Sequence, residues 1–184
     1  MIKLSDYVID FFAKINVKTV FTVSGGGSIF LCDSLQRSTK VSYVSCHHEQ
    51  AAAFAAESYA RQKNQIGGAL VTTGPGGTNA ITGVASSWID SIPTLFISGQ
   101  VFLNQTIQDT GLRQLGVQEI DIINLVKPIT KYAYMIEDAN SIKYHLEKAY
   151  FLATSNRPGP VWIDIPANIQ NTLINLKKLK NFTP

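Results

Sequence analysis

Cysteine, charge and long apolar runs are all scarce in this sequence of 184 residues. Cys32 and Cys46 are the two cysteines and form no CxxC pair, so a disulfide scaffold is not expected. Charged residues make up 16% and the net charge is +3, without the basic stripe that nucleic-acid binding requires. Residues 1–17 mix charged and apolar positions and predict neither a signal peptide nor a membrane span. We therefore expect a cytoplasmic protein that binds no nucleic acid and no membrane.

Strand-like and helix-like segments alternate along the chain. Six continuous apolar runs predict strands at residues 19–23, 41–45, 67–73, 93–99, 130–136 and 160–166. Helical spacing predicts helices around them, among them 27–37, 49–62, 120–126 and 139–155. Strands that are apolar along their whole length and alternate with helices indicate a parallel sheet covered on both faces. The expected fold is α/β, a three-layer doubly wound sheet of about six parallel strands.

Two segments fall outside this alternation. Residues 99–119 form no convincing helix or strand, yet carry apolar side chains throughout, so we expect a structured binding loop or one that a partner completes. Residues 169–184 lose the strong periodicity and gain charge. We therefore expect one domain at 1–168 and an exit or linker at 169–184.

A glycine-rich segment, TTGPGGTN, follows the third expected strand at residues 72–79. Ligands of open parallel sheets bind beyond the carboxyl ends of the strands, and SGGG (24–27), HHEQ (47–50) and SGQ (98–100) follow other strands in the same way. Glycines let the backbone approach a ligand closely, and Thr78 can cap the next helix. The patterns GxxxxGK[ST] and GxGxxG are both absent. Turn chemistry and a binding loop stay equally open for this segment alone.

Glu49 stands at the start of an alanine-rich helix, within SCHHEQAAAFAAESYAR at residues 45–61. As an acid in the first turn it would contribute about 0.3–1 kcal/mol through the helix dipole. A metal site is disfavoured, because adjacent residues at a strand end point to opposite faces and the run 46–49 cannot bind one ion as a set. The third interpretation is proton transfer. Small side chains let the helix pack closely and keep the site dry, so the carboxyl group could share a proton with a ring nitrogen.

Four segments together resemble the N-terminal pyrimidine-binding domain of thiamine-diphosphate enzymes, in particular the acetolactate synthase group. They are HHEQAAAFAAESYAR, TTGPGGTNAITGVASSWIDSIPTLFISGQV, QEIDI and RPGPVWIDIP, and they match in order and spacing to about residue 168. The resemblance implies that Glu49 hydrogen-bonds the N1′ nitrogen of the cofactor's aminopyrimidine and so promotes deprotonation of thiazolium C2. The cofactor carries the chemistry, and the protein supplies positioning and a proton relay.

The same resemblance assigns further residues to the site. Glu49 and Gln118 become the catalytic residues, and the cofactor-binding set is Gly25, Gly26, Glu49, Thr72, Pro75 and Asn79. His48 either supports Glu49 or is a structural histidine. No residue here is assigned to a metal, because these enzymes bind the diphosphate through Mg²⁺ on a separate domain marked by GDG, a sequence that this chain lacks.

The implied active site is half of a larger one, so this chain alone is expected to be inactive. Its partners would be a diphosphate-binding domain of the same or another chain, in a homodimer or homotetramer, and a small 2-keto acid substrate. We expect helix 49–62 and loop 99–119 to lie in a protein–protein interface. Residues 169–184 would lead to a middle domain, and the resemblance leaves FAD dependence open.

Three departures from the acetolactate synthase pattern keep the acceptor substrate open. Val23-Ser24 stand in place of Tyr-Pro, Val117 in place of Phe, and Ala167 in place of Lys. One alternative is transfer of a two-carbon unit to a keto-sugar, and another is a natural alpha subunit of a two-chain 2-keto-acid decarboxylase. The non-enzymatic alternative is a flavodoxin-like module that binds phosphate or nucleotide.

Overall fold

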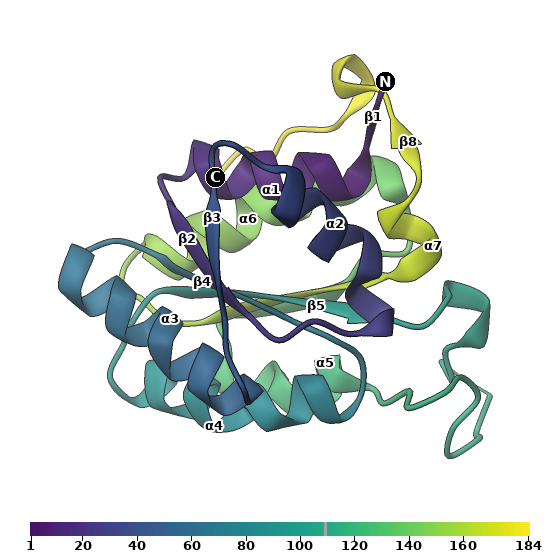
Figure 1. Ribbon diagram of the computed structural model, residues 1–184, viewed down its shortest axis with the longest axis horizontal. Coiled ribbons are helices and arrows are strands. Elements are labelled where there is room, and N and C mark those ends of the chain that lie inside the picture. Colours follow the sequence, from purple (N-terminus) through teal and green to yellow (C-terminus); the bar gives the residue numbers. More distant parts are fainter. Residues whose placement is uncertain (109) are drawn as a thin grey trace.

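The computed structural model describes residues 1–108 and 110–184, and six parallel strands form its main sheet (Figure 1). The strand order is β3-β2-β4-β5-β7-β6. The strands are β2 (Thr19–Thr22), β3 (Ser42–Ser45), β4 (Gly67–Val71), β5 (Thr94–Gln100), β6 (Tyr132–Met135) and β7 (Val161–Pro166). The predicted α/β sheet is confirmed.

Helices cover both faces of the sheet and complete three layers (Figure 1). One face carries α1 (Leu4–Lys14), α2 (Ile29–Arg37) and α6 (Ile142–Thr154), and the other carries α3 (Glu49–Lys63), α4 (Pro75–Ile89) and α5 (Ile122–Val126). Side chains of one strand alternate between the two cores: Leu95 and Ile97 enter the first, and Phe96 enters the second. Short 3-10 turns occur at Gly26–Ser28, Leu103–Gln105, Lys127–Ile129, Ala139–Ser141 and Leu176–Lys178.

The alanine-rich helix α3 packs unusually close to its neighbours. A Cβ atom added at Gly83 of α4 would lie 2.4 Å from Ala53 Cβ, and one added at Gly67 of β4 would lie 2.1 Å from the carbonyl oxygen of Ala56. Larger side chains at these points would push the helix away from α4 and the sheet. The close packing therefore sets the position of the first residue of α3, Glu49.

The C-terminal residues fold back onto the domain. After α7 (Ala167–Gln170), β8 (Leu173–Ile174) pairs antiparallel with β1 (Ile2–Lys3), as Figure 1 shows beside the N-terminus. Leu179 is buried, and Phe182 packs against Tyr144 with 5.6 Å between ring centroids. Strands of two residues carry no periodic signal, so the sequence did not predict this pair. The linker role of 169–184 stays a prediction.

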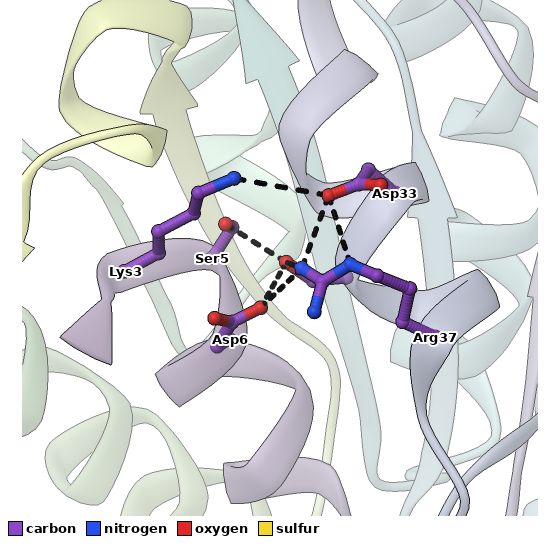
Figure 2. Close-up of polar contacts among 6 residues, drawn as sticks. Lys3, Ser5, Asp6, Asp33 and Arg37 are labelled. Atoms are coloured by element: carbon purple, nitrogen blue, oxygen red, sulfur yellow. Dashed lines mark hydrogen bonds and ion pairs between the residues drawn. The ribbon is translucent and has the colours of Figure 1, made fainter.

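A polar cluster fixes α2 against α1 (Figure 2). Arg37 Nη2 lies 2.7 Å from Asp6 Oδ1 and 3.0 Å from Asp33 Oδ2, and Lys3 Nζ lies 3.9 Å from the same Asp33 oxygen. Ion pairs as exposed as these contribute little to stability. No residue of the predicted site takes part.

In the described part of the chain, no helix is long and apolar enough to span a membrane.

Candidate functional site

The predicted site residues gather at the carboxyl ends of three adjacent strands. β3, β2 and β4 are neighbours in the sheet. Gly25 and Gly26 follow β2, Glu49 opens α3 just after β3, and Thr72 follows β4. Parallel strands bring these loops to the same edge, where α/β sheets bind their ligands. The fold therefore brings together residues that are distant in the chain, such as Gly25 and Thr72.

Glu49 is held by the neighbouring helix. Asn79, in the first turns of α4, donates from Nδ2 to Glu49 Oε2 at 2.9 Å, and Glu49 is only 8% exposed. The other carboxylate oxygen, Oε1, makes no hydrogen bond with any described residue and lies 3.4 Å from where a Cβ at Gly76 would stand. One oxygen is thus fixed, and the other remains available to a ligand.

His48 serves the start of the helix. It is the N-cap residue of α3, and its Nδ1 accepts a hydrogen bond from the Gln50 N–H at 3.1 Å. Its ring is exposed, and among the described residues no hydrogen bond joins it to Glu49. This hydrogen bond satisfies one of the backbone N–H groups that the first turn of a helix leaves without an intrahelical partner.

Thr72 is enclosed by two glycines from different loops. A Cβ at Gly25 would lie 2.4 Å from Thr72 Cγ2, and a Cβ at Gly76 would lie 2.6 Å from the same atom, so neither position accepts a side chain without movement. A Cβ at Gly26 would meet nothing within 4 Å. Thr72 Oγ1 is buried without a hydrogen-bond partner in the described structure. Pro75 occupies the first position of α4, where its missing N–H costs nothing.

Gln118 approaches the glycine-rich loop through its backbone. A Cβ at Gly74 would lie 2.0 Å from the Gln118 carbonyl oxygen, and Gly74 itself has a φ of +60°. Gln118 has a φ of +58°, a conformation that costs a residue other than glycine on the order of 1 kcal/mol. Its side chain is exposed and makes no hydrogen bond with Glu49 in the described residues. The structure thus places Gln118 at the same edge as the glycine-rich loop.

Two buried acids beside this edge were missed from sequence. Glu119 accepts hydrogen bonds from backbone N–H groups of the loop 101–119, and Asp164 lies in the middle of β7. Burial raises the pKa of Asp164 to about 7, although Ser98 and Gln100 donate hydrogen bonds to it and act to lower it. A signal was present in the sequence: a single acid inside the apolar strand VWIDIP, and another inside an apolar loop.

Both acids line a cavity of about 460 Å³, together with Gln100 and residues of α5. Neither Glu49 nor Thr72 lines this cavity. Within residues 1–108 and 110–184, no group of three or more His, Cys, Asp or Glu residues is placed to hold a metal ion.

Comparison with known proteins matches the sequence to one family. The family described as thiamine pyrophosphate enzyme, N-terminal TPP binding domain, matches residues 2–125. Acetolactate synthase, chloroplastic, of Arabidopsis thaliana is 39% identical over 93% of this chain and 25% of its own length. The acetolactate synthase isozyme 3 large subunit of Escherichia coli (strain K12) is 39% identical over 84% of this chain and 26% of its own. The chain therefore spans about a quarter of the length of these curated relatives.

Proposed function

Because the chain belongs to the thiamine pyrophosphate enzyme family, in the part that forms the N-terminal TPP binding domain, we propose that it is the pyrimidine-binding half of a carboligase or decarboxylase that acts on a 2-keto acid. The observation that carries this proposal is the carboxylate of Glu49, which has one oxygen fixed by Asn79 and the other available. The relatives are named acetolactate synthases, so this activity is the first candidate for the assembled enzyme.

The residues at this edge fit an aminopyrimidine ring. Glu49 Oε1 can pair with a ring nitrogen, and the buried Thr72 Oγ1 is a hydrogen-bonding group in need of a partner. Gly25 and Gly76 leave the backbone bare on either side of Thr72, so a flat ring can come close. Gly26, through its backbone, and Pro75, through its ring, complete the proposed cofactor-binding set. When bound, thiamine diphosphate supplies the carbanion chemistry that no amino-acid side chain provides.

The chain's own contribution is to hold a proton at one atom. Asn79 fixes Glu49 Oε2, so Oε1 is the oxygen that shares a proton with the ring nitrogen. The alanines of α3 pack tightly against α4, and this excludes water from the side of the carboxyl group that faces the core. Positioned acid–base groups typically contribute about 10²–10⁴-fold to a rate. Gln118 is the second residue that we assign to the reaction centre.

A second protein surface must complete this site. Mg²⁺ takes carboxylates together with diphosphate oxygens, and we assign both ion and diphosphate to a diphosphate-binding domain of the same or another chain. Exposed apolar side chains on α3 and on the loop 101–119 support such a surface: Phe54 is 38%, Leu115 49% and Val117 83% exposed. A homodimer or homotetramer would cover them. A requirement for FAD and a cytoplasmic location stay predictions.

A second candidate is transfer of a two-carbon unit to a keto-sugar. The observation that favours it is Val117, which stands beside Gln118 and is 83% exposed. The acetolactate synthase pattern has the larger Phe at this position, so Val117 leaves more room for an acceptor next to Gln118.

The test uses the active assembly that contains this chain, loaded with thiamine diphosphate and Mg²⁺. Release of CO₂ from pyruvate is measured with pyruvate alone and with added fructose as the keto-sugar, and the products are identified. Glu49→Gln should reduce CO₂ release by at least about 100-fold. Asp10→Asn, which removes an exposed carboxylate of α1 on the other face of the sheet, should leave it unchanged. Equal rates of CO₂ release in the Glu49→Gln assembly and in the control assembly would contradict the proposal.

A further inference from the structure

Glu119, the residue after Gln118, organises the long loop through its carboxylate. The carboxylate accepts a hydrogen bond from the backbone N–H of Ile107, and others from Leu115 at 3.0 Å and Gly116 at 3.4 Å. Glu119 is 8% exposed. Hydrogen bonds to an ionised acceptor are about twice as strong as neutral ones. A single side chain therefore ties the two ends of the stretch 107–116 to the residue next to Gln118.

Gln100 fixes the chain on the other side of Gln118. Its Nε2 donates to the carbonyl oxygen of Ile120 and to Asp164 Oδ2, both at 3.1 Å, and its Oε1 accepts from the Val101 N–H at 3.0 Å. Gln100 is 3% exposed. Its two amide hydrogens are thus committed to two buried acceptors.

The far end of this second connection is anchored in buried residues of β5 and β7. Asp164 Oδ1 accepts from Ser98 Oγ at 2.5 Å, and Ser98 Oγ in turn accepts from Trp162 Nε1 at 2.8 Å. Trp162 is fully buried and stacks on Phe96 with 5.3 Å between centroids. Gln100 therefore links the loop to fully buried residues of β7.

The backbone of Gln118 lies between these two connections. Its left-handed φ of +58° needs support from the surroundings, and its carbonyl oxygen is held against Gly74. Its side chain is exposed and has no hydrogen bond of its own in the described structure. The position of that side chain is consequently set by the backbone alone.

We propose that Glu119 and Gln100 are positioning residues for Gln118. They hold its backbone in the left-handed conformation and so fix the point from which its side chain reaches the reaction centre. The inference deepens the proposed function and rests on it, because it takes Gln118 to act at the reaction centre.

Two substitutions break these connections while keeping side-chain size. Glu119→Gln replaces one acceptor oxygen with an NH₂ group, which cannot accept from the loop N–H groups. Gln100→Met removes both donors and leaves the Ile120 carbonyl and Asp164 Oδ2 unpaired. A displacement of about 1 Å at a reaction centre can cost up to about 10²-fold in rate, so we expect about a tenfold loss in kcat/KM from either substitution.

The experiment is a double-mutant cycle in the active assembly, with thiamine diphosphate, Mg²⁺ and pyruvate as the probe substrate. kcat/KM is measured for wild type, Glu119→Gln, Gln118→Ala and the double variant. If Glu119 acts through Gln118, Glu119→Gln should cost about tenfold in the wild type and less than about twofold in the Gln118→Ala background. Losses that multiply in the double variant would overturn the proposal, as would a Gln118→Ala variant with unchanged kcat/KM.

Amide hydrogen exchange gives a readout that is independent of activity. In Glu119→Gln, peptides from residues 112–122 should exchange at least about tenfold faster, while peptides from β4 keep the wild-type rate. Unchanged exchange at 112–122 would overturn the proposal. Should Glu119→Gln fail to fold, Gln100→Met carries the same cycle and the same exchange measurement, and Asp10→Asn on α1 is the control for both.

Failure of this inference can be told apart from failure of the proposed function. Exchange of the cofactor's C2 proton depends on Glu49 and should be unaffected by Glu119→Gln. If Glu49→Gln slows that exchange while the cycle is additive, the positioning role alone is wrong. If Glu49→Gln leaves it unchanged, the proposed function itself is wrong.

Discussion

Asn79 donates a hydrogen bond to Glu49 across 2.9 Å between Nδ2 and Oε2. The two residues belong to the N-terminal parts of α3 and α4, helices that pack closely because Gly83 faces Ala53. This relationship leaves Glu49 with one fixed oxygen and one available oxygen, which is what a proton-sharing carboxylate requires.

Substitution of Asn79 should weaken the function of Glu49. Asn79→Ala removes the donor, frees the carboxylate to rotate and should lower turnover by about tenfold, a typical cost of losing one hydrogen bond to a charged group. Asn79→Asp should be more damaging, because two carboxylates would stand within hydrogen-bond distance. Steady-state turnover of the assembly checks both. Asn79→Asp at wild-type turnover would contradict the role of this contact.

The neighbouring glycines Gly25 and Gly26 should differ sharply. Gly25→Ala places a Cβ 2.4 Å from Thr72 Cγ2 and should destabilise the fold by about 1–3 kcal/mol. Gly26→Ala adds a methyl group in open space and should change stability by less than about 0.5 kcal/mol. Urea unfolding monitored by circular dichroism measures both free energies. Equal values for the two variants would show that the contact with Thr72 is not as close as described.

Asp164 should make stability depend on pH. Burial raises its pKa to about 7 from 3.8, so between these values the folded protein retains a proton that the unfolded chain has released. The stability that this proton contributes is fully present below about pH 4 and is lost as the pH rises through 7. Asp164→Asn does not titrate, so the wild type should lose stability relative to it from pH 4 to 7.5.

The comparison with Asp164→Asn is needed because titration of His145 changes the free energy of unfolding in the opposite direction as the pH rises. Burial lowers the pKa of His145 to about 4 from 6.5, so its contribution is lost as the pH falls through this range. Both proteins contain His145, and the difference between their unfolding free energies isolates Asp164. A difference that is constant from pH 4 to 7.5 would contradict the raised pKa.

The chain of residues 1–184 should bind thiamine diphosphate weakly when it is alone. Among the described residues, no group of three or more His, Cys, Asp or Glu is placed to hold a diphosphate through Mg²⁺. Titration calorimetry with Mg²⁺ should detect no binding at micromolar cofactor. Binding at micromolar or tighter affinity would show that this chain holds more of the site than we propose.

The sheet could be predicted because each strand is a continuous apolar run. The apolar run predicted as a strand at 93–99 corresponds to β5 (Thr94–Gln100), and the bounds differ by one residue. The convergence of Glu49 with Thr72 followed from the rule that the carboxyl ends of parallel strands lie at one edge of the sheet. The β1–β8 pair was too short to leave a pattern. The role of Glu119 depends on backbone N–H groups up to 12 residues away in the chain, which no local periodicity encodes.

The geometry of Gln118 illustrates the same limit. The sequence pointed to the residue through a family resemblance, but its left-handed φ and the contact with Gly74 arise from tertiary packing. For His48, the sequence left open whether the ring supports Glu49 or has a structural role. In the structure the ring caps α3 by accepting a hydrogen bond from the Gln50 N–H.

The most direct measurement is the rate at which the C2 proton of thiamine diphosphate exchanges with deuterium when the cofactor is bound to the assembly, because it needs no substrate. Glu49→Gln should slow this exchange by about 10²-fold or more, since Gln cannot share an ionisable proton with the ring nitrogen. Cofactor binding and the circular dichroism spectrum should be retained. A Glu49→Gln assembly that binds the cofactor and exchanges C2 at the wild-type rate would contradict the central claim.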